Sequence, residues 1–119
     1  MDQRVRTLAA FMQDNFYQPL IRDELARVVN LSPSRLRHLF KEATGITLAE
    51  YQRNVRMKRA KTLLETSLLS VKEIMASVGA HNKSHFISDF KKLYGMTPTE
   101  YRRSWMMTPP PDNSPVEYL

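Results

Sequence analysis

Apolar residues recur at every third or fourth position through most of the chain. In the first segment, about residues 3–16, they are Val5, Leu8, Ala9, Met12 and Phe16. This spacing lines one face of an α-helix, whereas a half-buried strand needs strict alternation of apolar and polar positions. We therefore expect an all-α protein.

Helix start and stop signals divide the chain into seven predicted helices. Ser, Thr and Asn are favoured just before a helix, Pro at its first position and Gly just after its end. Thr47, Ser70 and Thr97 are each followed three residues later by Glu, which is the capping-box pattern. The predicted helices cover about 3–16, 22–29, 33–45, 47–65, 71–79, 82–95 and 98–105.

The predicted helix over residues 47–65 is apolar on more than one side. A helix of this kind is usually covered from two directions, so we expect it to link two packed halves. About 18 residues of helix are about 27 Å long. We expect this length to set the distance between the two halves.

An internal repeat is the most specific signal. Residues 34–53 and 84–103 share Ser, Phe, Lys, Gly, Thr, Glu, Tyr and Arg in register. Each copy follows a short helix and a turn, where Asn30 and Gly79 supply residues tolerant of positive φ. Two helices joined by a turn of three or four residues form a helix-turn-helix motif. The chain is thus predicted to contain this motif twice.

Composition narrows the class of partner. Lys and Arg number 18 against 12 Asp and Glu, a formal net charge of +6, which favours nucleic acid or an anionic membrane surface. The absence of Cys excludes disulfides and thiolate zinc sites and suits a reducing compartment. No apolar run reaches the length of about 18 residues that spans a membrane, and the first residues lack the apolar core of a signal peptide.

Five motifs in this order resemble the AraC/XylS family of bacterial transcription regulators, over Val5 to about Arg103. They are Leu-Ser-Pro-Ser-Arg-Leu-Arg-His-Leu-Phe-Lys at 31–41, Gly-Ile-Thr-Leu at 45–48, Arg-Met-Lys-Arg-Ala-Lys-Thr-Leu-Leu at 56–64, Phe-Ile-Ser-Asp-Phe-Lys-Lys at 86–92 and Gly-Met-Thr-Pro-Thr-Glu-Tyr-Arg at 95–102. The family usually has Ser or Thr where Ile21 stands, Ala where Met75 stands and Phe where Ala80 stands. We expect the last two exchanges to compensate in volume.

The resemblance implies seven helices in two helix-turn-helix subdomains, joined by a long linker helix. The DNA-binding domain would cover residues 3–107, with motifs at about 22–45 and 71–95 and the linker at about 47–65, leaving a Pro-rich tail at 108–119. It also implies a cytoplasmic, nucleoid-associated regulator that binds operator DNA and RNA polymerase. An N-terminal effector domain would lie outside this chain, and no cofactor, enzymatic activity or membrane partner is expected.

Helical geometry separates inward from outward positions on the two predicted recognition helices. Leu36, Leu39, Phe40 and Ala43 would face the core, as would Phe86, Phe90 and Leu93. Recognition helices read bases mainly with their N-terminal half, and Arg, Ser, His and Lys can bond to base edges. The predicted base contacts, which match base-contacting positions in the family, are Ser34, Arg37, His38, Lys83, Ser84, His85 and Ser88. The predicted phosphate contacts, which fix register without reading sequence, are Arg35, Lys41, Lys91 and Arg102.

Other interpretations fit the residues less well. A helical protein-interaction module would expose Phe or Leu on the outward faces, where this chain has Ser, His, Arg and Lys. His81, His85 and Asp89 have a spacing that could ligate a metal, but no fourth ligand is apparent. No nucleophile with an adjacent base and orienting acid can be assembled, so an enzyme is not expected. The basic run on residues 53–61 is ambiguous, and a solvated face with internal salt bridges is its ordinary interpretation. The resemblance to the AraC/XylS family implies a structural role for Arg56, which matches a family Arg that often has one.

Overall fold

The computed structural model describes residues 2–20 and 22–107 of the 119-residue chain. Over this part of the chain it contains seven α-helices and no strand, so the predicted all-α fold is confirmed. The helices are α1 (Gln3–Asp14), α2 (Arg22–Val28), α3 (Pro33–Thr44), α4 (Leu48–Thr66), α5 (Val71–Val78), α6 (Lys83–Tyr94) and α7 (Pro98–Met107). The predictions for Ile21 and for the 108–119 tail lie outside the described residues.

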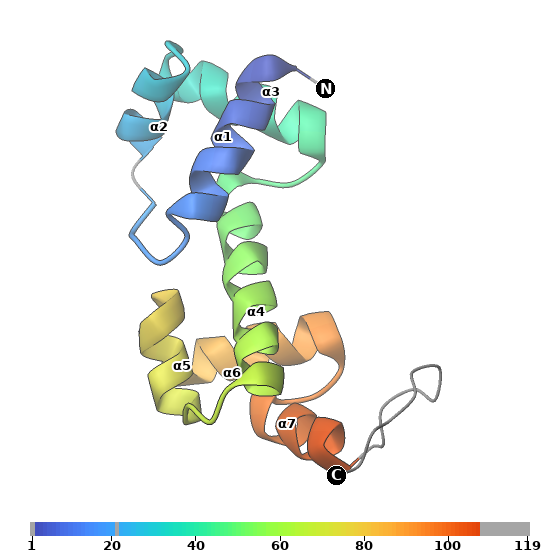
Figure 1. The fold of residues 1–119 in the computed structure, drawn as a ribbon. Helices are drawn as coiled ribbons and strands as arrows, with labels where there is room; N and C mark the ends of the chain where they lie inside the picture. Colours follow the sequence, from blue (N-terminus) through green and yellow to red (C-terminus); the bar gives the residue numbers. More distant parts are fainter. Residues whose placement is uncertain (1, 21, 108–119) are drawn as a thin grey trace, which may run out of the picture.

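The molecule is elongated, with principal extents of 56 × 32 × 22 Å. Helix α4 runs along its middle, with α1, α2 and α3 gathered at one end and α5, α6 and α7 at the other (Figure 1). The chain therefore begins its described part with α1 at the first end and closes it with α7 at the second. The fourth helix therefore links two halves, as its two-sided apolar pattern predicts.

Local signals account for most of the helix boundaries. Ser32, Thr47, Ser70 and Asn82 cap α3 to α6 with their side chains, and Gly45, Gly79 and Gly95 follow α3, α5 and α6 in the left-handed conformation. The capping boxes at Ser70 and Thr97 are reciprocal. At Thr47 the box is incomplete, because Glu50 accepts a hydrogen bond from the Thr47 hydroxyl rather than from its backbone N–H.

Several predicted helix ends are shifted by one or two residues. Helix α1 ends at Asp14, two residues before the predicted Phe16. The Asn15 side chain donates to the Phe11 carbonyl, and Asn side chains that bond to the nearby backbone favour helix ends over helix interiors. Phe16 then belongs to the following loop, where it packs against the distant end of the molecule. Helix α2 ends at Val28 rather than Val29.

Each half has its own hydrophobic core, and α4 contributes to both. The first core consists of Val5, Leu8, Met12, Leu25, Ala26, Val29, Leu36, Phe40 and Leu48. The second consists of Met57, Ala60, Leu64, Ile74, Met75, Val78, Phe86 and Phe90. Met75 is 8% exposed and Ala80 packs against this same second core, so the two exchanges relative to the family lie in one cluster.

Two residues predicted to face the core are exposed: Ala43 on α3 and Leu93 on α6, the latter 45% exposed. They occupy equivalent places in the repeat, in the last turn of α3 and of α6. The buried side chains of these helices, Leu36 and Phe40 on α3 and Phe86 and Phe90 on α6, all lie earlier. A helical wheel gives only an angle, whereas burial also needs a neighbouring element at the same height along the helix axis.

Within the described residues, none of the helices combines the length and apolar character that a membrane span requires.

Candidate nucleic-acid interface

Helix α3 has a capped N-terminus, a buried apolar side and an exposed polar side. The Ser32 hydroxyl accepts a hydrogen bond from the Arg35 backbone N–H at 3.2 Å, with Pro33 in the first turn, so the start of the helix is defined by its caps. On the opposite side, Leu36 and Phe40 are fully buried. The predicted base-contacting residues of this helix are all exposed: Ser34, Arg37 and His38.

Helix α6 has the same construction at the other end of the molecule. Asn82 caps it by accepting a hydrogen bond from the His85 backbone N–H at 2.9 Å. Phe86 and Phe90 anchor the helix in the second core at 2% and 0% exposure. The predicted base-contacting residues here are also all exposed: Lys83, Ser84, His85 and Ser88.

The turns before the two recognition helices match each other. Asn30 has φ 56° and Gly79 has φ 78°, as the sequence predicts for both. The Leu31 N–H donates to the Ala26 carbonyl, and the Ala80 N–H to the Met75 carbonyl, each at 2.9 Å. These bonds span five residues, as in the Schellman ending of a helix. The repeat in the sequence is therefore a repeat of backbone geometry.

A repeated Tyr fastens each recognition helix to the helix after it. The Tyr51 ring meets the Phe40 ring edge-on at 5.4 Å, and the Tyr101 ring meets the Phe90 ring at 5.7 Å. Aromatic pairs in this geometry stabilise a contact beyond the area they bury. The repeat places Tyr51 and Tyr101 at equivalent positions, but their contacts with Phe40 and Phe90 were not predicted from the sequence.

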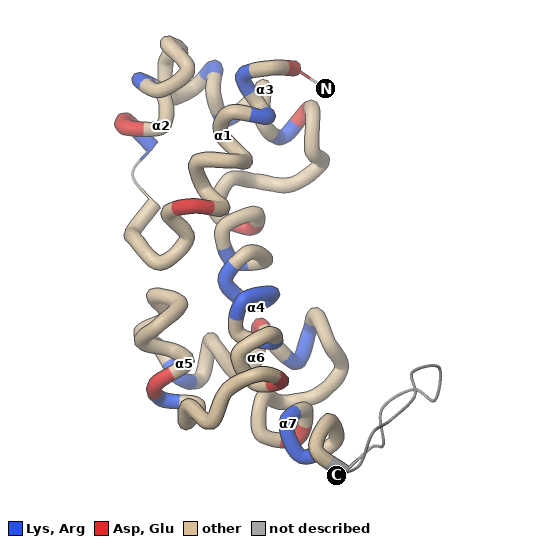
Figure 2. Tube along the Cα trace, viewed as in Figure 1, with Lys and Arg blue, Asp and Glu red and all other residues tan. Residues whose placement is uncertain are grey.

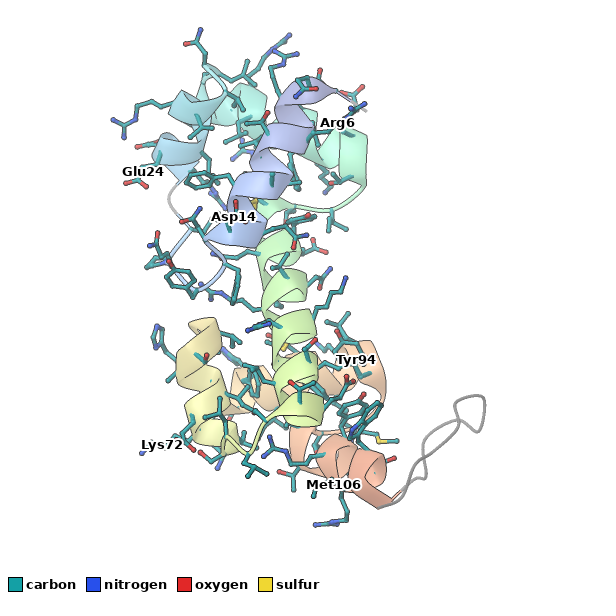
Figure 3. All side chains as sticks on the ribbon, in the orientation of Figure 1. Arg6, Asp14, Glu24, Lys72, Tyr94 and Met106 are labelled. Carbon is teal, nitrogen blue, oxygen red and sulfur yellow. The ribbon has the colours of Figure 1, made fainter. Side chains whose placement is uncertain are left out.

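A second contact missed from the sequence joins α4 to the end of the second motif. The Tyr101 hydroxyl donates to the Glu65 carboxylate, which also pairs with Lys61 at 3.1 Å. The Lys61 ammonium group lies 5.7 Å from the ring centres of Tyr94 and Tyr101, and Figure 3 shows Tyr94 beside this end of α4. Hydrogen bonding to Glu65 raises the pKa of Lys61. Lys61 therefore has structural contacts.

Three of the four predicted phosphate-contacting residues, Arg35, Lys41 and Lys91, are exposed. Arg102 has another environment, since its guanidinium donates to the carbonyls of Leu64 at 3.2 Å, Leu69 at 2.5 Å and Ser67 at 3.2 Å. Carbonyls at a helix C-terminus lack intrahelical partners and attract cations. Arg102 thus caps α4 and attaches α7 to it, and its predicted phosphate contact stays a prediction.

The basic run along the middle of α4 is conspicuous in Figure 2. Arg56 is half-buried, and its Nε and Nη2 atoms donate to the carbonyls of Phe16 and Gln18. Desolvation by burial lowers the pKa of Arg56. Arg53 forms an ion pair with Asp89 at 3.6 Å. Much of this run therefore stabilises the fold, in line with the structural interpretation.

No group of three His, Cys, Asp or Glu side chains that could hold a metal ion occurs in the described part of the chain. Asp89, one member of the candidate triplet with His81 and His85, faces Arg53 instead.

Comparisons with known proteins agree with this geometry. A family model described as a helix-turn-helix domain matches residues 25–104. The C-terminal domain of AraT, a response regulator from Geobacillus stearothermophilus, has a TM-score of 0.81 and 31% identity, over 95% of this chain and 94% of that one. The arabinose operon regulatory protein of Escherichia coli (strain K12) is 34% identical over 103 residues, or 86% of this chain and 35% of its own length.

The DNA-binding domain of AdpA, solved in complex with a target DNA, shares the fold with a TM-score of 0.79 and 22% identity, over 87% of this chain and 94% of that one. The chain spans about a third of the length of the curated relatives it matches. The family match covers both copies of the repeat and all of the linking helix, and AraT is covered almost completely at 31% identity. The chain therefore belongs to the AraC-type family of helix-turn-helix DNA-binding domains.

Proposed function

We propose that this chain binds double-stranded DNA sequence-specifically, with α3 and α6 reading two successive major-groove segments. The observation that carries the proposal is the pair of equivalent helices at opposite ends of α4. Each is anchored by two buried apolar residues, Leu36 and Phe40 or Phe86 and Phe90, and each exposes a polar, basic N-terminal half. A recognition helix with this distribution suits the major groove.

The residues divide into two roles. Arg37 can donate two hydrogen bonds to guanine, and Ser and His can donate or accept at other base edges. The proposed base contacts are Ser34, Arg37, His38, Lys83, Ser84, His85 and Ser88. The proposed phosphate contacts are Arg35, Lys41 and Lys91. Helix α6 offers no Arg, so we expect it to discriminate between bases less strongly than α3.

The length of α4 supports the two-segment arrangement. Its 19 residues correspond to about 28 Å of helix. Successive major-groove segments on one face of the duplex lie about 34 Å apart. Because α3 and α6 lie toward opposite ends of α4 (Figure 1), we expect one monomer to span two segments.

For the whole protein we propose a transcription regulator that acts in the cytoplasm in association with the nucleoid. Its DNA-binding domain would cover residues 3–107, and its partners would include RNA polymerase and an N-terminal effector domain outside this chain. The polar outward faces of α3 and α6 argue against a protein-interaction module that lacks DNA binding. We propose no enzymatic activity, since the residues that the geometry brings together serve capping and packing.

Selection of sites from random double-stranded DNA at near-physiological salt tests the proposal. We expect enrichment of two short motifs about one helical turn apart. A single enriched motif would keep the DNA-binding assignment but reduce α6 to a backbone clamp. No enrichment, even at low salt, would overturn the proposal and favour an interaction module.

A further inference from the structure

The loop between α1 and α2 contacts both halves of the molecule. It follows a helix of the first half, yet Phe16 packs against the second hydrophobic core. Besides α4, the first and second halves therefore share another connection, formed by residues 16–18 of this loop. We call these three residues the bracing loop.

Two side chains of α4 hold the bracing loop by its backbone. The Arg56 Nε donates to the Phe16 carbonyl at 2.6 Å, and its Nη2 donates to the Gln18 carbonyl at 2.8 Å. The Gln52 amide donates to the same Gln18 carbonyl at 2.8 Å. Hydrogen bonds from a charged donor are stronger than those between neutral groups, above all where water is partly excluded.

The bracing loop also touches the turn of the second helix-turn-helix motif. A Cβ atom added at Gly79 would lie 2.3 Å from the Tyr17 carbonyl oxygen and 2.9 Å from its carbonyl carbon. The two backbones are thus packed directly against each other. Gly79 serves two needs at once, since its φ of 78° turns the chain and its lack of a side chain admits the loop.

The bracing loop therefore connects three parts of the molecule: the first half, to which it belongs, the linker helix α4 and the second motif. A single helix joining two small subdomains would let them bend and twist relative to one another. A further contact away from the axis of α4 resists both motions. The relative orientation of α3 and α6 then depends on the bracing loop as well as on the length of α4.

We propose that Arg56, assisted by Gln52, is a positioning residue for DNA recognition: it holds the bracing loop against Gly79 and so sets the spacing and rotational phase of the two DNA segments that one monomer reads. This inference rests on the proposed function. Two linked binding modules gain affinity only when their geometry permits both to engage. Loosening the brace lowers the affinity for a two-segment site without changing how either helix reads its own segment.

The test compares the full chain with Arg56→Gln on three DNA duplexes. One carries both selected motifs, one has the α6 motif scrambled, and one has two base pairs inserted between the motifs. We expect Arg56→Gln to bind the intact site about tenfold more weakly while binding the scrambled site as the wild type does. The loss of affinity caused by the two inserted base pairs is expected to be smaller for the variant than for the wild type.

Arg59→Gln is the matched control, because Arg59 is exposed on the same helix and the substitution removes the same charge. It should leave the ratio of intact to scrambled binding unchanged. Arg56→Lys, which can restore one of the two hydrogen bonds, should recover part of the ratio. Equal weakening of Arg56→Gln on intact and scrambled DNA would overturn the positioning role.

Gln52→Ala keeps the test decisive if thermal melting shows that Arg56→Gln fails to fold. It removes one hydrogen bond to the bracing loop and no charge, and it should shift the same ratio in the same direction by a smaller factor. An unchanged ratio and an unchanged spacing preference in Gln52→Ala would then refute the proposal. Failure of the wild type to prefer the intact site would instead refute the two-segment reading itself.

Discussion

The arginines of this domain differ in what their guanidinium groups contact. Arg56 and Arg102 donate to backbone carbonyls and join elements together. Arg35 and Arg37 lie exposed on α3. In the sequence all four are simply arginines on predicted helices. Residue type and charge alone therefore do not tell a structural arginine from one that is free to contact DNA. Substitution can, because the roles differ in what they stabilise.

Arg37→Ala should relax specificity at one base position and cost about 1–3 kcal/mol of binding free energy. Arg35→Ala, at an exposed position two residues away on the same helix, should weaken binding to all sequences about equally and reduce the salt dependence by about one unit of slope. Affinity measurements on a panel of single-base variants of the selected site, at several salt concentrations, check both. Equal effects of Arg37→Ala on every sequence would show that it contacts phosphate.

Arg102→Gln should lower the free energy of unfolding by about 1–3 kcal/mol, since charged hydrogen bonds to the end of α4 are lost. The salt dependence of DNA binding should stay the same. The exposed neighbour Arg103 supplies the control Arg103→Gln, which should barely change stability. Denaturant unfolding and salt titrations are the measurements. An unchanged stability together with a lower salt slope would restore Arg102 as a phosphate contact.

At the level of helices and turns, the helix ends add local hydrogen bonds to the packing of the cores. Exposed helix N-termini carry N–H groups that need acceptors, and side-chain caps provide them. The capping box of α5 is reciprocal, with the Ser70 N–H donating to Glu73 at 2.9 Å and the Glu73 N–H donating to the Ser70 hydroxyl at 3.1 Å. The hydrogen bond that the Glu73 carboxylate accepts from the Ser70 backbone N–H lowers the pKa of Glu73 most, and hydrogen bonding to the Ser70 side chain lowers it further.

A lowered pKa in the folded state makes the cap of α5 sensitive to acid. The stability that ionised Glu73 contributes is fully present above the pKa that Glu73 has in the unfolded chain. It is lost as the pH falls through the lower pKa that Glu73 has in the folded state. Melting temperatures between pH 7 and pH 3 should therefore fall less for Glu73→Gln than for the wild type. Glu42→Gln, at an exposed position of α3, is the control. A wild-type pH profile in Glu73→Gln would contradict the prediction.

At the scale of the whole molecule, two small cores share one long helix. Leu48 of α4 belongs to the first core, and Met57, Ala60 and Leu64 belong to the second. Neither half is large enough to bury much surface alone. The shared helix and the bracing loop make one body of them, with a DNA-reading helix in each half.

Hydroxyl-radical footprinting of the selected site should show two protected segments about 10 base pairs apart on one face of the duplex. Ser88→Asp places a negative charge on the exposed face of α6 and should remove one of the two protected segments while the other persists. A single protected segment, unaffected by Ser88→Asp, would contradict reading by both helices. The intact fold of the variant is checked by its melting curve.

Periodicity, caps and the internal repeat suffice for the seven helices, for the two motifs and for the outward faces of α3 and α6. These features depend on neighbours close in sequence: a Ser or Thr cap bonds within its own helix, and Asn30 or Gly79 turns the chain locally. Contacts between distant segments follow no such local rule. The burial of Ala43 and Leu93 was predicted wrongly, because a helical pattern does not specify where the neighbouring helices end.

The hydrogen-bond partners of Arg56 and Arg102 likewise depend on contacts between distant segments. Each finds its carbonyl partners more than 30 positions away, at places where another element stops and leaves acceptors free. The chemistry of the recognition faces is therefore readable from residues along the chain. Which basic residues remain available for DNA, and how firmly the two faces are held together, depends on where the packed helices end.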